Sequence, residues 1–508
     1  MSRALFAAAA LVGTCLSAAP ALAKSAYDGV WLFDEGQPKL GPNPGVTMME
    51  VASKGGKITG SVTTQWYGPV EMQDPHVENG VLRFTARNIN DREHPTRDWS
   101  VTLEAGKAHL KGQIWESEVD GFGRPGTAKD AKARAFRFTA LPALGAPIPK
   151  TLAATPPMGW SSWNKFAEHI DDKTVRAMAD AMVSTGLRDA GYTYVNIDDG
   201  WQGKRDPNGV LQPNAKFPDM KALTDYVHSK GLKIGIYSSQ GPRTCAGYEG
   251  SYGHVQQDAK TYAEWGFDYL KYDLCSGEWF YADADTVQRS YHEMGAALQA
   301  TGRDFIFSLC EYGRFDVGRW GRDVGGQLWR TTGDITDDYP TMAKIGFDKN
   351  GNPDWAGPHG WNDPDMLEVG NGGMSADEYR THMTLWAMSA APLMMGHDLR
   401  ETSPETLAML TNRRVIAIDQ DARGVQGKAV RKDGATEVWA KPLADGRVAL
   451  ALFNRGDAAV SLAITAQDAG LREITQVQDA WSGATSPRPA TAYAIPARGA
   501  ALIVLSGK

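Results

Sequence analysis

Acidic residues stand repeatedly at the ends of strand-like segments in this chain. Asp273 follows the apolar stretch in DYLKYDLC. The same placement recurs at five further acids, in YVNIDDGW, LWRTTGD and WNDPDML: Asp198, Asp199, Asp334, Asp363 and Asp365. One such residue could cap a helix, but independent caps do not explain so many acids beside so many tryptophans. The carboxyl ends of strands are where a (β/α)8 barrel builds its active site.

Two of these acids fit the cleavage of a glycosidic bond. The reaction needs one carboxylate as nucleophile or base and one carboxylic acid that protonates the leaving oxygen. Asp273 suits the first role and Asp334 the second. A separation of about 5–5.5 Å gives retention of configuration, and a wider separation gives inversion. Asp337 and Asp338 are alternative acids, with helix capping as their other interpretation.

Basic residues lie close to both acids in the sequence. Lys271 precedes Asp273 by two positions and therefore shares its face of the strand, where its charge would keep the carboxylate ionised. A Schiff-base role for Lys271 is disfavoured, because a carboxylate neighbour keeps the amine protonated. Arg330 lies four residues before Asp334 and would oppose its protonation.

The adjacent pair Asp198 and Asp199 suits a grasp of two neighbouring sugar hydroxyls. Calcium at these oxygens is an alternative, but the chain has no HxxxH or EF-hand pattern, so we expect no metal and no cofactor. Trp160, Trp163 and Trp201 could each be core residues. We expect Trp160 to stack on a sugar face.

Residues 152–420 alternate strand-like and helix-like segments. Eight candidate strands occur in the order MGWSSW, YTYVNIDD, LKIGIYSS, DYLKYD, FIFSLC, QLWRTTGD, GWNDPDM and PLMMGHD. Their number and order predict a (β/α)8 TIM barrel. A doubly wound open sheet is the alternative, but it would usually carry a Gly-rich phosphate loop, which this sequence lacks.

Two β regions flank the barrel, so we expect a multidomain α/β and β protein. Residues 25–147 alternate apolar and polar positions in short runs and predict an N-terminal antiparallel β domain. Residues 424–508 predict a small C-terminal antiparallel β-sandwich. Four N-terminal tryptophans could form a glycan-binding surface, build the domain's own core or pack on the barrel: Trp31, Trp66, Trp99 and Trp115.

Composition and the first residues limit the partners and the compartment. The 508-residue chain has a formal net charge of -7 with well-mixed charges, which argues against nucleic acid. Residues 1–23 read as a signal peptide: Arg3 supplies the charge, an apolar stretch follows, and cleavage is expected after Ala23. The stretch is too short to span a membrane comfortably. We expect an exported protein, periplasmic or extracellular; a lipoprotein anchored at Cys15 is the weaker alternative.

Three cysteines remain after the signal peptide. In an exported protein, one disulfide and one free thiol is the default. Cys245 and Cys275 follow two successive strands, so we pair them. Closing a loop of about 30 residues would stabilise the fold by roughly 3–4 kcal/mol. Cys310 is then expected to stay reduced and buried.

Nine ordered motifs resemble glycoside hydrolase family 27, the α-galactosidase family of clan D. They are TPPMGWSSWNKF, IDDGW, TCAGYEGSYG, YLKYDLC, SLCEYG, RTTGD, WNDPDMLEVGN, SAAPLMMGHDL and VIAIDQD, and they cover roughly residues 155–426. The resemblance implies a retaining α-glycosidase with Asp273 as nucleophile, Asp334 as acid/base and Arg330 on the sugar. It implies galactose contacts from six residues: Trp160, Asp198, Asp199, Lys271, Cys310 and Asp365. It also implies the Cys245–Cys275 disulfide.

Departures from the family pattern bear on the substrate. Gly200 replaces a cysteine found in many members, so a further family disulfide is lost. Tyr312 stands where many members have tryptophan, near the 2-hydroxyl of the sugar. Glu311 and Tyr312 are too large for an acetamide, which disfavours α-N-acetylgalactosaminidase activity. Asp199 is retained, which favours galactose over β-L-arabinopyranose.

We therefore expect an exo-acting, retaining α-D-galactosidase that acts on a carbohydrate substrate. The alternatives are β-L-arabinopyranosidase or α-N-acetylgalactosaminidase activity, and, more remotely, a non-catalytic carbohydrate-binding protein.

Overall fold

The computed structural model describes residues 24–34, 39–40, 43–87, 96–114, 117–149 and 151–508. The chain forms two compact units: Met1–Lys39, Pro44–Thr64 and Gly68–Phe136 make up the first, and Leu40–Asn43, Gln65–Tyr67 and Arg137–Lys508 the second. The predicted signal peptide, its cleavage site and Cys15 lie outside the described residues. Among the described residues, no helix is both long and apolar enough to cross a bilayer.

The first unit contains an antiparallel sheet of nine strands in the order β6-β5-β4-β1-β11-β10-β9-β8-β7. The strands are β1 (Gly29–Leu32), β4 (Val46–Lys54), β5 (Lys57–Thr64), β6 (Gly68–Glu71), β7 (Gln73–Glu78), β8 (Val81–Arg87), β9 (Thr96–Glu104), β10 (Lys107–Ile114) and β11 (Ser117–Gly126). A short ribbon pairs β2 (Lys39–Leu40) with β3 (Asn43–Pro44), and α1 (Ala128–Arg134) follows the sheet. The predicted antiparallel strands are confirmed.

Three of the four N-terminal tryptophans are buried. Trp31, Trp66 and Trp99 are only 7%, 1% and 6% exposed. Alternating burial along the strands, as in β8, places large apolar side chains on the inner face. A glycan-binding surface made of these three side chains is therefore wrong, because burying a large apolar ring is more favourable than exposing it to water. Trp115 lies outside the described residues.

The second unit contains a sheet of eight parallel strands, one in each predicted segment. They are β12 (Met158–Ser161), β13 (Tyr194–Asn196), β16 (Lys233–Ser239), β17 (Tyr269–Asp273), β18 (Ile306–Cys310), β19 (Leu328–Arg330), β20 (Trp361–Asp363) and β21 (Leu393–Met395). The first strand, β12, pairs with both β13 and β21. Leu367, four residues after β20, forms a parallel bridge with Met395 in β21.

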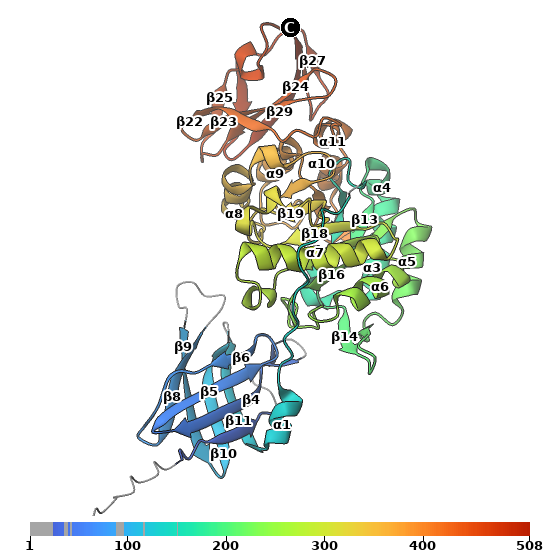
Figure 1. Ribbon diagram of the computed structural model, residues 1–508. Helices are drawn as coiled ribbons and strands as arrows, with labels where there is room; N and C mark the ends of the chain where they lie inside the picture. The colour runs from blue at the N-terminus through green and yellow to red at the C-terminus, as the bar shows by residue number, and fades with distance from the viewer. Residues whose placement is uncertain (1–23, 35–38, 41–42, 88–95, 115–116, 150) are drawn as a thin grey trace, which may run out of the picture. The chain divides into compact units, whose positions relative to one another are not determined.

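Helices separate these strands and lie on the outside of the sheet (Figure 1). The α-helices are α2 (Trp163–Phe166), α3 (Asp172–Ser184), α4 (Leu187–Ala190), α5 (Met220–Ser229), α6 (Val255–Trp265), α7 (Ala284–Ala300), α8 (Tyr339–Ala343), α9 (Ala376–Ser389), α10 (Pro404–Leu410) and α11 (Arg413–Asp419). Helix α3 shows why they form: its buried residues recur every three or four positions, and Asp171 caps its first turn through the amide of Thr174.

Shorter elements complete the connections. They are η1 (Ala167–His169), η2 (Gly277–Trp279), η3 (Arg314–Arg319), η4 (Lys344–Lys349), η5 (Pro353–Trp355) and η6 (Leu399–Glu401), with a ribbon of β14 (Gln202–Arg205) and β15 (Leu211–Pro213).

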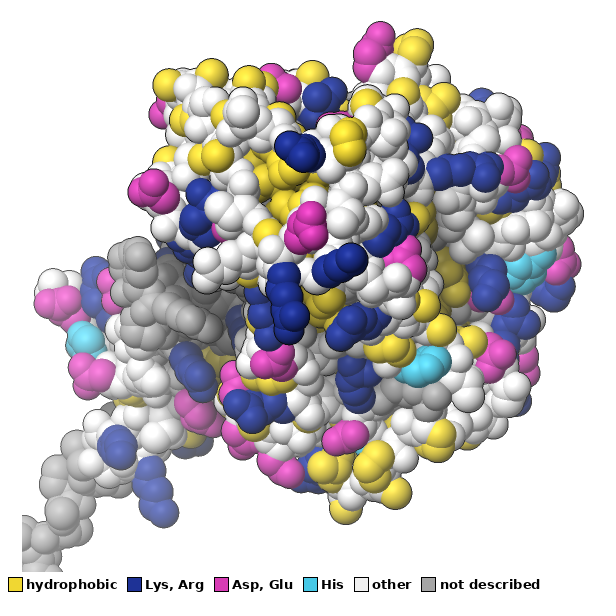
Figure 2. Space-filling model, turned by 90° about the horizontal axis from the view of Figure 1, so that it is seen from above, with side chains coloured by type: hydrophobic (Ala, Val, Ile, Leu, Met, Phe, Trp, Pro, Cys, Tyr) yellow, Lys and Arg dark blue, Asp and Glu magenta, His cyan; other side chains and the backbone are white. Residues whose placement is uncertain are grey.

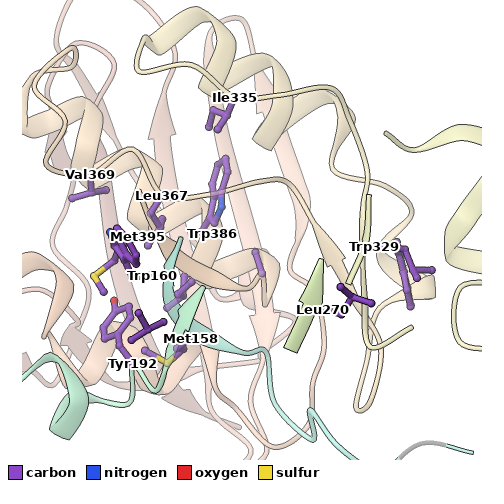
Figure 3. Packing of buried hydrophobic residues seen from close by; sticks show 14 of the residues in the cluster. Met158, Trp160, Tyr192, Leu270, Trp329, Ile335, Leu367, Val369, Trp386 and Met395 are labelled. Atoms are coloured by element: carbon purple, nitrogen blue, oxygen red, sulfur yellow. The ribbon is translucent and has the colours of Figure 1, made fainter. Parts of the chain in front are cut away.

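The core of this sheet is filled by large side chains from strands and helices. Trp160 is fully buried among them, beside Met395 and Met158 in Figure 3. Its indole nitrogen donates a 2.8 Å hydrogen bond to the carbonyl oxygen of His397. The side chain is thus fixed inside the core, and its polar atom is satisfied.

The chain ends in the predicted antiparallel β region. Six strands run in the order β22-β23-β24-β29-β26-β27, and β25 pairs with β28. They are β22 (Lys428–Asp433), β23 (Thr436–Pro442), β24 (Val448–Asn454), β25 (Val460–Leu462), β26 (Ile474–Asp479), β27 (Thr485–Ser486), β28 (Tyr493–Ile495) and β29 (Ala500–Gly507), with η7 (Ala466–Ala469). The ammonium of Lys441 in β23 is buried and donates to the carbonyl oxygen of Ala387 in α9. Charged side chains of both signs are interspersed on the face seen in Figure 2.

Candidate active site

Predicted site residues line one cavity at the carboxyl ends of the parallel strands. Its volume is about 620 Å³, within the usual range of small-ligand sites. Eight of the ten predicted catalytic and substrate-binding residues line it: Asp198, Asp199, Lys271, Asp273, Tyr312, Arg330, Asp334 and Asp365. The structure thus brings together acids that are up to 167 residues apart in sequence.

Trp160 and Cys310 are the two that do not line the cavity. Burial of Trp160 in the core leaves no ring face for a sugar, so the stacking role predicted for it is not supported. Trp163, which the prediction left without a role, lines the cavity and is half-buried. Cys310 is a buried free thiol, as expected, with the Arg330 guanidinium 3.8 Å from its sulfur.

The carboxylate of Asp273 is held by three donors. Tyr312 donates to Oδ1 at 2.7 Å and Tyr237 to Oδ2 at 3.1 Å, while the amide of Cys275 donates to Oδ1 at 3.3 Å. Asp273 ends β17, and only 3% of it is exposed. Such a network fixes the orientation of the carboxylate before any substrate arrives.

Burial and charge act against each other on Asp273. Burial raises the pKa of its carboxyl above the ordinary value, whereas Lys271 and the Tyr312 hydrogen bond lower it; Asp334 and Asp198 add to the rise. The direct ion-pair partner of Lys271 is Asp198, at 2.9 Å, rather than Asp273. Lys271 therefore affects the nucleophile candidate through space.

Asp334 is tied to Arg330, as the sequence spacing suggested. The guanidinium lies 3.1 Å from Asp334 and 2.8 Å from Asp365, and the Asp334 side chain is 65% exposed. Burial alone would raise the pKa of Asp334, but Arg330 and Lys271 outweigh it and the net pKa is lowered. In the unliganded protein this acid is ionised at neutral pH.

Asp365 holds the loop that carries Asp334. Its Oδ2 accepts the amide of Ile335 at 2.9 Å and its Oδ1 accepts the amide of Met366 at 2.8 Å. Asp365 itself has a φ of 85°, in the left-handed region that non-glycine residues rarely adopt. Backbone strain of this kind clusters at functional sites.

The predicted hydroxyl-binding pair is buried at the end of β13. Asp199 accepts the amides of Ala246 and Gly200, at 2.8 Å and 2.9 Å. Burial raises the pKa of Asp199 to about 7 despite these hydrogen bonds. Asp198 takes the ammonium of Lys271, so the two acids have different electrostatic environments.

The predicted disulfide between Cys245 and Cys275 is present, with the Cα atoms 5.1 Å apart. Its sulfurs lie 3.7 Å and 3.6 Å from the hydroxyl of Tyr312. Tyr312 has a φ of 62°. The disulfide and this unusual backbone together direct the phenol to Asp273. Within the described chain, the one group of candidate metal ligands is Cys245, Asp273 and Cys275; because both sulfurs are oxidised, only the carboxylate could bind an ion.

Sequence reasoning missed several lining residues. Tyr237 lies opposite Lys271 on the neighbouring strand, which the predicted strand alignment could have indicated. Asn164, Glu368 and Asn371 also line the cavity, and burial raises the pKa of Glu368 to about 7. Asp337 accepts from Tyr379, and Asp338 caps α8 through Thr341, so the two alternative acids have structural partners.

Comparison with known proteins places these features in a family. A family profile described as "Alpha galactosidase A" matches residues 155–421, and one described as "Alpha galactosidase C-terminal beta sandwich domain" matches residues 433–505. This chain belongs to the α-galactosidase family, glycoside hydrolase family 27. The family profile begins at residue 155, beyond the N-terminal unit.

Relatives named as α-galactosidases cover about two thirds of this chain. An "Alpha-galactosidase" of Cyamopsis tetragonoloba is 48% identical over 340 residues, covering 66% of this chain and 81% of the relative. "Alpha-galactosidase A" of Cellvibrio japonicus is 45% identical over 385 residues, covering 70% and 93%. The solved structure of α-galactosidase I from Mortierella vinacea has a TM-score of 0.67 at 33% identity, covering 70% and 98%.

Proposed function

We propose that this protein is an exo-acting, retaining α-D-galactosidase that releases terminal α-linked galactose from oligo- or polysaccharides. The observation that carries the proposal is the placement of Asp273 and Asp334 in one cavity with a ring of charged sugar-binding candidates. Relatives named as α-galactosidases, which match 66% and 70% of this chain, support it as well.

We also propose that the eight parallel strands form a closed (β/α)8 barrel. Two observations support closure: β21 pairs with β12, and Leu367 bridges to Met395 beyond β20. Closure would bring the carboxyl ends of all eight strands to one rim, where barrel enzymes hold their active sites.

The reaction proceeds in two displacements. Asp273 attacks the anomeric carbon while the bond to the leaving oxygen breaks, and Asp334 gives its proton to that oxygen. The intermediate formed by this first displacement is a galactosyl ester on Asp273. Asp334, now ionised, takes a proton from water, whose oxygen attacks the anomeric carbon and frees Asp273. Two inversions return the original configuration.

Asp334 must gain a proton before the first step, although Arg330 lowers its pKa in the unliganded protein. A bound sugar would remove water from this exposed carboxyl and draw the guanidinium toward its hydroxyls. Both changes raise the pKa of Asp334, since burial disfavours the ionised form and a more distant cation stabilises it less. Substrate binding thus favours the protonated form of Asp334 that the first step needs.

Charged side chains surround the place of the sugar. Asp198 and Asp199 accept hydroxyl hydrogens, and Lys271 and Arg330 donate to hydroxyl oxygens. Trp163 offers a ring to the apolar face of galactose, the role first expected of Trp160. Tyr312 lines the cavity and limits the space near the sugar, which supports galactose over N-acetylgalactosamine.

The test is the Asp273→Ala protein on an aryl α-galactoside, where at least a roughly 10³-fold loss of kcat is expected for removal of a nucleophile. A slow fluorinated galactosyl donor should label Asp273 in the wild type and leave the variant unlabelled. Near-normal activity of the variant would overturn the proposal.

We further propose that the protein is exported, periplasmic or extracellular. The sequence of residues 1–23 motivates this, and the Cys245–Cys275 disulfide is compatible with an oxidising compartment. Sequencing the N-terminus of the protein from the exported fraction should give Lys24 as the first residue. A mature protein that keeps Met1 would contradict export.

A further inference from the structure

The cavity has a second polar wall that the proposed mechanism does not use. Six lining residues belong to it: Asn164, Lys165, Thr336, Asp337, Glu368 and Asn371. They come from the start of α2 and from the loops that follow β19 and β20. Because one cavity includes both walls, it has room for a ligand larger than a single galactose.

The position of Asp334 shows which part of the ligand meets this wall. A general acid must lie within hydrogen-bond reach of the oxygen that it protonates. That oxygen joins galactose to the leaving group, so the leaving group lies beside Asp334. Thr336 and Asp337 follow Asp334 closely on the same loop. The second wall is therefore on the leaving-group side.

Glu368 organises this wall. It is only 2% exposed, yet both of its oxygens accept hydrogen bonds from amide side chains. Nδ2 of Asn164 donates to Oε1, and Nδ2 of Asn371 donates to Oε2 at 2.6 Å. Above its raised pKa of about 7, the Glu368 carboxyl is ionised and only accepts, so it turns both NH2 groups toward itself. The amide carbonyl oxygens must then point elsewhere.

These two carbonyl oxygens are available to a ligand. Among the described residues, neither the Oδ1 of Asn164 nor that of Asn371 accepts a hydrogen bond. Both residues are half-buried on the cavity wall. A pair of oriented acceptors suits a ligand that carries several hydroxyl donors, as a sugar does. An aromatic ring has no such donors and would form no hydrogen bonds with them.

We propose that Asn164 and Asn371 bind hydroxyl groups of a saccharide leaving group, and that Glu368 is a positioning residue that fixes both amides. The preferred substrates are then galactosides of a second sugar rather than of an apolar alcohol. This inference rests on the proposed α-galactosidase function.

The test compares two substrates with the same galactosyl group, an α-1,6-linked galactosyl-hexose disaccharide and 4-nitrophenyl α-galactoside, at about pH 7.5. In Asn164→Ala and Asn371→Ala, kcat/KM on the disaccharide should fall about tenfold, roughly the loss of one hydrogen bond, mainly through KM. On the aryl galactoside, kcat/KM should change less than about threefold. Glu368→Gln should show the same selective loss, because its own NH2 group can turn one asparagine amide around.

Asn208→Ala is the matched control, since Asn208 is an exposed amide outside the cavity lining. It should leave kcat/KM on both substrates unchanged. The inference is wrong if the ratio of the two kcat/KM values stays constant in variants whose melting temperature matches that of the wild type. Equal losses on both substrates would also overturn it. A wild type that cleaves neither substrate would instead refute the proposed function.

Discussion

The phenol of Tyr312 donates a 2.7 Å hydrogen bond to Oδ1 of Asp273, and it does so from a backbone with positive φ that lies against the Cys245–Cys275 disulfide. A hydrogen bond to the ionised form of a carboxyl lowers its pKa. In this site it opposes burial, which raises the pKa of Asp273. Tyr312 thus connects the shape of a loop to the charge of the proposed nucleophile.

Tyr312→Phe removes this donor and keeps the ring. The pKa of Asp273 should rise, so the acidic limb of the kcat/KM profile on an aryl galactoside should move to higher pH by about one unit, the worth of one charge-assisted hydrogen bond. Activity on the plateau should change less than activity at low pH.

Tyr226→Phe is the control for this change, because Tyr226 also donates to an aspartate, Asp180, outside the cavity lining. Its pH profile should coincide with that of the wild type. An unmoved acidic limb in Tyr312→Phe would show that the phenol only fills space.

Asp334→Ala removes the proposed acid/base. Cleavage of a disaccharide should fall by about 10²–10⁴-fold, because its leaving oxygen needs a proton. A nitrophenolate leaves without one, so formation of the galactosyl ester on Asp273 should be much less affected. Added azide needs no general base and should restore turnover of the aryl galactoside, with α-galactosyl azide as the product. Recovery of turnover without that product, or no recovery, would contradict the assignment.

The sequence predicted the framework of this site better than its contacts. All eight parallel strands lie in predicted segments, since each buried strand is a short apolar run bounded by loop-forming residues. The Cys245–Cys275 pairing followed from the same strand order. Asp273, Asp334 and Asp365 meet because parallel strands end at one rim.

Contacts that depend on side-chain direction were not predictable in this way. Trp160 and Trp163 stand three residues apart, and only folding decides that Trp160 enters the core while Trp163 reaches the cavity. Lys271 shares the strand face of Asp273, as period two requires, yet pairs with Asp198 from another segment. Glu368 carries no spacing signal, because its partner Asn164 comes from a segment far away in the sequence.

Asp199→Asn should increase the free energy of unfolding and reduce activity. Burial raises the pKa of Asp199 from 3.8 to about 7, so the folded state binds its proton more tightly than the unfolded state does. The acid therefore destabilises the fold increasingly as pH rises from about 4 to 7, by up to about 4 kcal/mol. The asparagine variant escapes this cost but loses part of the hydrogen bonding to two amides. We expect it to be about 1–3 kcal/mol more stable than the wild type at about pH 8 and no more stable at about pH 4.

Urea unfolding at a series of pH values measures this difference, and the same variant should lose at least about tenfold in kcat/KM. Asp189→Asn, at an exposed position, should show no stability difference that grows with pH. If the difference between Asp199→Asn and the wild type stays constant across this pH range, burial of the Asp199 charge is not its cause.

Loss of the disulfide should affect both stability and catalysis. Cys245→Ser removes the disulfide bond between two residues that are 30 positions apart in sequence, which should lower the free energy of unfolding by about 3–4 kcal/mol. It also removes one of the two sulfurs that lie against the Tyr312 hydroxyl, that of Cys245, and frees the other, that of Cys275, from the bond that holds it. The phenol then gains freedom to leave Asp273, so kcat should fall and the acidic limb should move in the same direction as in Tyr312→Phe. Urea unfolding and pH profiles measure the two effects.

The double variant Cys245→Ser/Cys275→Ser should be no less stable than either single variant, because one bond is lost in each case. If instead the two single losses add, the cysteines stabilise the fold separately and the link from disulfide to nucleophile fails.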